Sequence, residues 1–185
     1  MDMNSLEGKL LVAMPSIGDP RFDRTVIYLC AHSADGAMGL IVNKRADELD
    51  FETLLEQLSI EAGGGSVPIY FGGPVENARG MVLHSTEYEV NESTMKVSDT
   101  VAMTASMEIL EDIAQGHGPE NGLLALGYAG WGPGQLESEI RNNGWLVADA
   151  DEAILYSIDD ETKWQRGLQQ LGIDPRLLSA EGGSA

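Results

Sequence analysis

The 185-residue sequence contains one cysteine, few bases and no long apolar run. A single cysteine, Cys30, excludes an internal disulfide bond. No apolar stretch reaches the roughly 20 residues that a membrane-spanning helix needs. The first residues hold neither a basic nor a long apolar segment, so we expect no signal peptide. Together these absences predict a cytoplasmic protein with no membrane partner.

Bases are scarce: 11 Lys and Arg stand against 30 Asp and Glu, for a net charge of -19 and a pI of about 4.2. Binding nucleic acid normally requires Lys or Arg to neutralise several phosphates, so nucleic acid is disfavoured as a partner. The charge is uneven, since residues 1–45 hold five acids and five bases and residues 46–185 carry the whole excess. An anionic ligand would therefore meet the least repulsion in the first 45 residues.

Recognisable cofactor motifs are absent as well. His32, His84 and His117 lack the spacing of paired metal ligands, so we predict no metal. The glycine-rich stretch at 127–134 resembles a dinucleotide-binding loop, but Glu137 stands where the third glycine belongs and no P-loop lysine follows. A carboxylate in the first helical turn opposes phosphate binding. The sequence predicts no cofactor.

Hydrophobic residues make up 43% of the chain, which is enough to build a core. Two apolar strands around Asp35–Gly36 predict a β-hairpin. Further strands are expected at 9–14, 67–71, 80–85, 123–128, 145–148 and 153–156, and helices at 51–58, 101–115, 134–142 and 161–171. A hairpin followed by irregular alternation predicts an α/β (α+β) fold, a mixed sheet packed by about four helices. We expect one domain over residues 5–174 and a disordered tail at 175–185.

Two residues on one predicted strand are candidates for catalysis. Cys30 and His32 lie two residues apart, so their side chains point to the same side of the strand. A thiolate beside an imidazole is a nucleophile arrangement. The alternative is a buried, inert cysteine, which is the commoner outcome.

Five polar or aromatic positions could border a binding site. Gln135 and Glu139 are four residues apart on a predicted helix and share a face, which either borders a site or is solvated. Trp131 either fills a gap or lines a pocket mouth. Arg24 and Lys44 are expected near one another across the hairpin, where they would bind an anion or pair with neighbouring acids.

Several stretches resemble the YqgE/AlgH family of bacterial proteins, and they follow one another in the same order as in that family. They are GKLLVAMP at 8–15, FDRTVIY at 22–28, GAMGLIVN at 36–43, GGPV at 72–75, GYAGWGPGQLESEI at 127–140 and Trp145. The resemblance implies a compact α/β domain with a partly barrel-like sheet and an association with bacterial gene regulation. It supplies no catalytic residues.

From these residues we predict one shared ligand-binding pocket. Its members are Arg24, Asn43, Gly72, Gly73, His84, Trp131, Gln135 and Glu139. The leading hypothesis is a non-catalytic domain that binds a small molecule or a protein and acts on gene expression indirectly. The alternatives are a Cys30-dependent hydrolase or thiol-redox enzyme, and a direct transcriptional regulator that uses Arg21, Arg24, Lys44 and Arg45.

Overall fold

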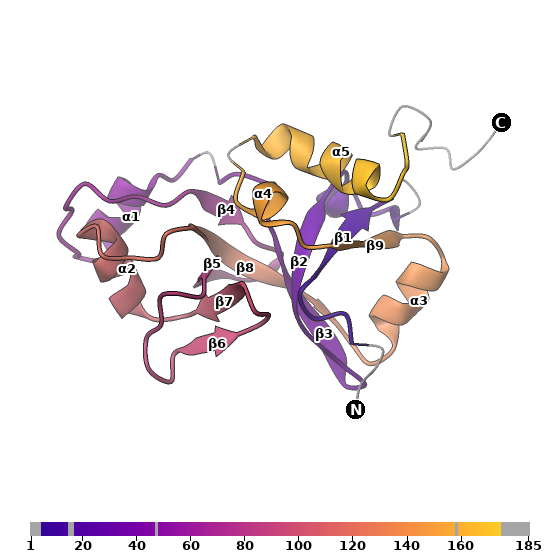
Figure 1. The fold of residues 1–185 in the computed structure, drawn as a ribbon, viewed down its shortest axis with the longest axis horizontal. Coiled ribbons are helices and arrows are strands. Elements are labelled where there is room, and N and C mark those ends of the chain that lie inside the picture. The colour runs from indigo at the N-terminus through magenta and orange to yellow at the C-terminus, as the bar shows by residue number, and fades with distance from the viewer. Residues whose placement is uncertain (1–4, 15–16, 47, 158, 175–185) are drawn as a thin grey trace. The chain divides into compact units, whose positions relative to one another are not determined.

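The structure is a computed structural model that describes residues 5–14, 17–46, 48–157 and 159–174 (Figure 1). The chain forms two compact units, which we call unit 1 (residues 1–44 and 129–185) and unit 2 (residues 45–128). The expected single domain over 5–174 stays a prediction, because two compact units can belong to one folding domain. The expected disordered tail lies outside the described residues.

Unit 1 is a set of antiparallel strands with helices packed on them. Its strands pair in the order β9-β1-β2-β3, and the last three residues of β8 pair with β3. The elements are β1 (Lys9–Ala13), a 3-10 turn η2 (Pro20–Phe22), β2 (Val26–Ser33), β3 (Gly36–Ile41), β8 (Gly122–Trp131), α3 (Gln135–Arg141), β9 (Trp145–Asp149), α4 (Glu152–Leu155) and α5 (Asp160–Gln170). The predicted hairpin of β2 and β3 is confirmed.

The turn of that hairpin requires glycine. Gly36 has a φ of 138°, and a Cβ atom there would lie 2.4 Å from the backbone oxygen of Trp131. Beyond the turn, the first five residues of β2 are all buried, as expected for a strand covered on both faces. On one side α5 covers β1 (Figure 1). The indole N–H of Trp164 in α5 donates to the Ala13 carbonyl at 2.8 Å.

Unit 2 has its own sheet and two helices. The strands pair in the order β6-β7-β5-β8, all antiparallel, and β4 pairs with β8 in parallel. The elements are α1 (Phe51–Gln57), β4 (Ile69–Phe71), β5 (Val75–Ser85), β6 (Thr94–Lys96), β7 (Val101–Thr104), α2 (Met107–Ala114) and β8 up to Tyr128. As expected for an N-cap, the Asp50 carboxylate accepts from the Thr53 N–H at 2.8 Å.

The predicted α+β class with a mixed sheet is confirmed, whereas two predicted elements are wrong. Residues 101–104 form β7, and the expected helix at 101–115 is confined to α2. Pairing of β7 with both β5 and β6 outweighs the local helical spacing. The strand expected at 153–156 is the short helix α4, because the Asp151 side chain caps it by accepting from the Ala153 N–H.

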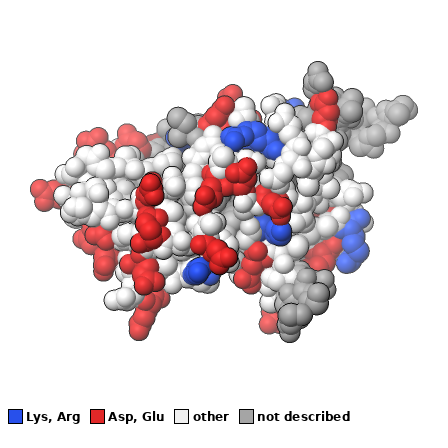
Figure 2. All heavy atoms as spheres, in the orientation of Figure 1, with Lys and Arg blue, Asp and Glu red and all other residues white. Residues whose placement is uncertain are grey.

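Two surface properties bear on function. In the part of the chain that the structure describes, no helix is both long and apolar enough to cross a bilayer. Figure 2 shows acidic side chains spread over the visible face, with only a few bases between them.

Candidate functional site

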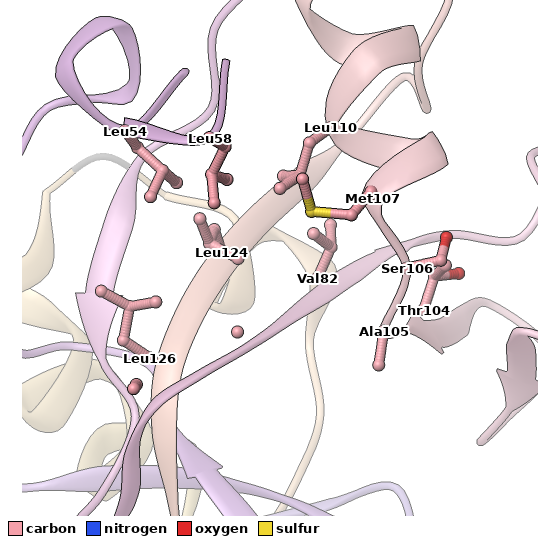
Figure 3. Close-up of a pocket in the computed structure, with 12 residues that line it drawn as sticks. Leu54, Leu58, Val82, Thr104, Ala105, Ser106, Met107, Leu110, Leu124 and Leu126 are labelled. Carbon is pink, nitrogen blue, oxygen red and sulfur yellow. The ribbon is translucent and has the colours of Figure 1, made fainter. Parts of the chain in front are cut away.

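Unit 2 contains a pocket of about 220 Å³ between its two helices and its sheet (Figure 3). Helical spacing places Leu54 and Leu58 of the α1 segment on one wall, and Met107 and Leu110 of α2 on another. Alternate residues of two strands point to the same side of the sheet and form the floor of the pocket. Its residues are Ala78, Gly80 and Val82 from β5 and Leu124 and Leu126 from β8.

The pocket has free space beside β5 because residue 80 is a glycine. The β5–β8 register shifts between Val75 and Gly80, so the first part of β5 leaves the regular ladder. A Cβ atom on Gly80 would lie 3.3 Å from a Leu124 methyl carbon and 3.4 Å from one of Leu126. A larger side chain at this position would therefore occupy the pocket.

One end of the pocket is polar. Thr104, which is fully buried, and Ser106 line it there, opposite the leucines (Figure 3). The buried Ser106 hydroxyl oxygen has no hydrogen-bond partner, although Ser106 precedes α2 as its N-cap residue. This oxygen has almost no accessible surface, so a ligand in the pocket contacts the carbon atoms of this end and not the hydroxyl.

His84, one of the predicted site residues, is fully buried behind this wall. Its Nδ1–H donates to the Ser85 carbonyl at 2.9 Å, and its Nε2 accepts from the Thr104 hydroxyl at 2.6 Å. Thr104 in turn accepts from Thr94, which accepts from the Val90 N–H. Burial lowers the pKa of His84, which favours this neutral ring. His84 thus orients Thr104 from outside the pocket.

A second hollow in unit 2, of about 390 Å³, is a weaker candidate for a ligand site than the first pocket. Phe51 and Val67 contribute apolar surface to it, but its charged groups already have contacts. Arg45 lies over the Tyr70 ring at 5.2 Å, and Asp50 caps α1.

Three of the other predicted site residues meet in unit 1 around Glu139. Its Oε1 accepts from both indole N–H groups, Trp131 at 2.9 Å and Trp145 at 2.8 Å. Its Oε2 accepts from the Gln135 amide at 3.0 Å. The shared face of Gln135 and Glu139 is confirmed, and the contacts it makes hold two largely buried tryptophans in place.

Arg24 and Asn43 also lie together in unit 1, where they close the open end of the hairpin. The Asn43 side chain accepts from the Val26 N–H and donates to the Arg24 carbonyl, both at 2.9 Å. Arg24 adopts a φ of 52°, and its guanidinium lies 5.2 Å from the Trp164 ring centre. Lys44 donates to the Asp23 carbonyl at 2.6 Å rather than to a carboxylate.

Gly72 and Gly73 belong to unit 2, where they follow β4. A Cβ atom on Gly72 would lie 2.3 Å from the Gly127 carbonyl oxygen. The Gly73 carbonyl accepts from the Asn77 amide at 3.0 Å. Gly72 therefore allows a close approach of the two backbones. That these two, His84 and the unit 1 residues form one shared pocket stays a prediction.

The catalytic candidates on β2 are placed less favourably for chemistry. Cys30 is 1% exposed, and burial, with a smaller contribution from Glu7, raises the pKa of its thiol far above the ordinary value. His32 accepts from the Leu6 N–H at its Nδ1 and donates from Nε2 to Glu137 at 2.9 Å. This bond to His32 lowers the pKa of Glu137. Both ring nitrogens are thus occupied, and the thiol stays protonated.

Sequence reasoning missed two features. It recognised Leu54, Leu58, Met107 and Leu110 only as apolar stripes, which are the signal that could have located the pocket. It also missed Lys163, a fully buried lysine that donates to carbonyls of Val42 and Leu155. Among the described residues, no three His, Cys, Asp or Glu side chains are grouped to hold a metal ion.

The fold and its pocket define a mixed α+β protein with an apolar hollow beside a sheet. The model of the AlgH-like family matches residues 10–176, so the chain belongs to that family. It is 58% identical to a UPF0301 protein of Ruegeria pomeroyi over 97% of this chain and 99% of the relative, and 53% identical to one of Paracoccus denitrificans over the full length of both. The solution structure of the AlgH protein from Pseudomonas aeruginosa is 40% identical, covers 100% of this chain and 98% of that one, and has a TM-score of 0.80.

Proposed function

We propose that this protein is a non-catalytic binding domain that holds a small molecule by a compact apolar group in the unit 2 pocket. The observation that carries the proposal is the pocket itself, with aliphatic walls from four separate elements. Val82, Leu110 and Leu124 are nearly fully buried, so they offer a dry surface, while Met107 is 47% exposed at its edge. Apolar ligands favour concave, largely pre-formed sites with a few polar groups.

The volume limits the size of the ligand. An apolar cavity of about 150 Å³ holds benzene, and drug-sized ligands occupy pockets of about 300–1,000 Å³. At about 220 Å³ this pocket suits an apolar group slightly larger than benzene, such as a six-carbon chain or a substituted ring.

Two further observations support binding without catalysis. The Cys30 thiol is buried and its pKa is raised, which opposes a role as nucleophile. His84 directs both ring nitrogens to fixed partners, so it has no free nitrogen to act as a base at the pocket. We therefore propose that any effect on gene expression is indirect, through a partner that responds to the ligand, and takes place in the cytoplasm.

The test measures binding of 1-hexanol to the full chain by calorimetry and by the shift in melting temperature. Wild type should bind, and Gly80→Val should weaken binding at least tenfold because its side chain fills the pocket. Gly122→Ala lies on the same ladder, with its nearest atom an ordinary 3.4 Å from the added Cβ, and should bind like wild type.

A second pair of variants keeps the test decisive if Gly80→Val does not fold. Met107→Glu places a carboxylate at the pocket edge, and Met95→Glu makes the same change at another exposed methionine. Only the first should reduce 1-hexanol binding. If Gly80→Val binds 1-hexanol as tightly as Gly122→Ala, and Met107→Glu binds it as tightly as Met95→Glu, the proposed function is contradicted.

A further inference from the structure

A histidine in β2 of unit 1 joins two segments that are distant from it in the sequence. The side chain of His32 is only 5% exposed. Its Nδ1 lies 3.0 Å from the Leu6 backbone nitrogen, and its Nε2 lies 2.9 Å from the Glu137 carboxylate of α3. Because a backbone N–H only donates and a carboxylate only accepts, neutral His32 must carry its proton on Nε2. The neutral ring therefore bonds to both segments at once.

The bond with Leu6 requires a neutral ring. A protonated imidazole carries a hydrogen on each nitrogen, so Nδ1 can no longer accept from the Leu6 N–H. The contact with Glu137 changes in the opposite sense, because it becomes a charge-assisted bond between imidazolium and carboxylate. The bond from His32 lowers the pKa of Glu137, so this carboxylate stays ionised in the pH range where histidines take up a proton. Protonation thus strengthens the contact with α3 and breaks the contact with Leu6.

The local fold limits how much of the chain this change can move. Leu6 begins a turn in which the Lys9 N–H donates to the Leu6 carbonyl at 3.0 Å and Gly8 has a φ of 81°. The Gly8 N–H donates to the Leu29 carbonyl of β2 at 2.8 Å. The chain is therefore attached to β2 from Gly8 onward, whatever the charge of His32. Loss of the Leu6 bond frees residues 5–7 and leaves β1 and β2 paired.

Other charged groups lie on the elements packed around His32. β3, which pairs with this end of β2, has no charged residue. The others are Glu7 in the segment before β1, Lys9 in β1 with its partner Asp149, Asp35 in the hairpin turn, and Glu139 and Arg141 in α3. None of them is printed as a bonding partner of the ring, so the variants below leave all of them in place.

We infer that His32 is a pH-sensitive switch that holds residues 5–7 against β2 when it is neutral and releases them when it is protonated, while it stays bound to α3. The switch lies in unit 1 and does not involve the pocket of unit 2.

The experiment follows the full chain by NMR from about pH 8 to about pH 5, the range in which histidine changes its charge. Imidazole nitrogen shifts report the protonation of His32, and amide hydrogen exchange, corrected for its intrinsic pH dependence, reports the protection of Leu6. We expect the protection of Leu6 to fall about tenfold as His32 is protonated, which is the factor for one net hydrogen bond. The amides of Ala13 and Val42, which donate to carbonyls of β2 and its preceding residue, should stay protected. Constant protection of Leu6 while His32 is protonated would overturn the inference.

A variant of the histidine tests whether its charge is the cause. His32→Asn places a side-chain oxygen that does not titrate near the position of Nδ1, so Leu6 should stay protected at about pH 5. His117→Gln removes an exposed histidine and should respond like wild type. A wild-type response of Leu6 in His32→Asn would also overturn the inference.

A second pair of variants keeps the test decisive if His32→Asn does not fold. Glu137→Gln keeps an acceptor for Nε2 but removes the charge that stabilises the imidazolium, so the loss of Leu6 protection should move to lower pH. Glu161→Gln makes the same change at an exposed position of α5 and should leave the midpoint unchanged. The same midpoint in both variants would contradict the role of Glu137 in the switch.

Discussion

Units 1 and 2 differ in what their buried polar groups do. In unit 1, Glu139, His32 and Lys163 each bind two or more partners, which lie on different elements or in the turns between them. In unit 2, the chain of hydrogen bonds through His84 passes through Thr104 at a pocket wall, near the unpartnered Ser106 hydroxyl, and continues to Thr94. The comparison indicates that polar contacts in unit 1 maintain the fold, whereas those in unit 2 border a space that a ligand can enter.

The largest effect expected in unit 1 comes from Lys163→Met. This change leaves the Val42 and Leu155 carbonyls and the Asp160 carboxylate without their buried donor. Breaking a buried charge network in this way costs about 3–5 kcal/mol. Chemical denaturation should show this loss, while Arg166→Met on the same helix, at a half-buried position, should cost much less. Equal losses would mean that the Lys163 contacts contribute little.

Glu139 should rank next. Glu139→Leu removes the acceptor of two indole N–H groups and should lower the free energy of unfolding by about 2–3 kcal/mol. Glu139→Gln keeps an acceptor oxygen and should recover part of that loss. Tryptophan fluorescence during denaturation measures both. A Glu139→Leu protein as stable as wild type would remove the main support for the role assigned to unit 1.

The dependence of stability on pH should show the role of the buried His84 in unit 2. Because the pKa of His84 is lowered in the folded protein, the unfolded chain takes up a proton first as the pH falls below about 6.5. The stabilisation by neutral His84 is therefore complete above this pH and is lost as the pH falls toward the lowered value. His84→Gln should reduce the loss of stability between pH 7.5 and pH 5, and His117→Gln, at an exposed position, should not. The same acid response in both variants would argue against this role for His84.

The smallest effect is expected at Cys30. Its thiol should react with a labelling reagent only in denaturant, because the folded protein keeps it buried and protonated. Rapid labelling of the native protein at neutral pH would instead favour the Cys30-dependent enzyme.

Local sequence patterns were sufficient where neighbours in the chain decide the structure. The turn at Asp35–Gly36 predicted the β2–β3 hairpin, and Asp50 predicted the start of α1. Local patterns failed for residues 101–104. The spacing between Met103 and Met107 fits a helix, but these residues form a strand because its pairing depends on distant residues.

The candidate site was only partly predictable for the same reason. Predicted site residues such as Asn43, from a family-like stretch, and Glu139, from a shared helix face, bond to neighbouring parts of unit 1. The pocket arises from the apolar stripes of two helices together with the open space at Gly80. No local pattern shows where such stripes leave a space, because this depends on the packing of four elements.

The most direct test of the account follows the methyl groups of the full chain by NMR during a titration with 1-hexanol. We expect shifts at Leu54, Leu58, Leu110 and Leu124, and none at the buried unit 1 residues Leu10, Leu29 and Leu40. Gly80→Val should abolish the shifts. Shifts centred on the unit 1 leucines, or an unchanged pattern in Gly80→Val, would contradict the assignment of the binding site to unit 2.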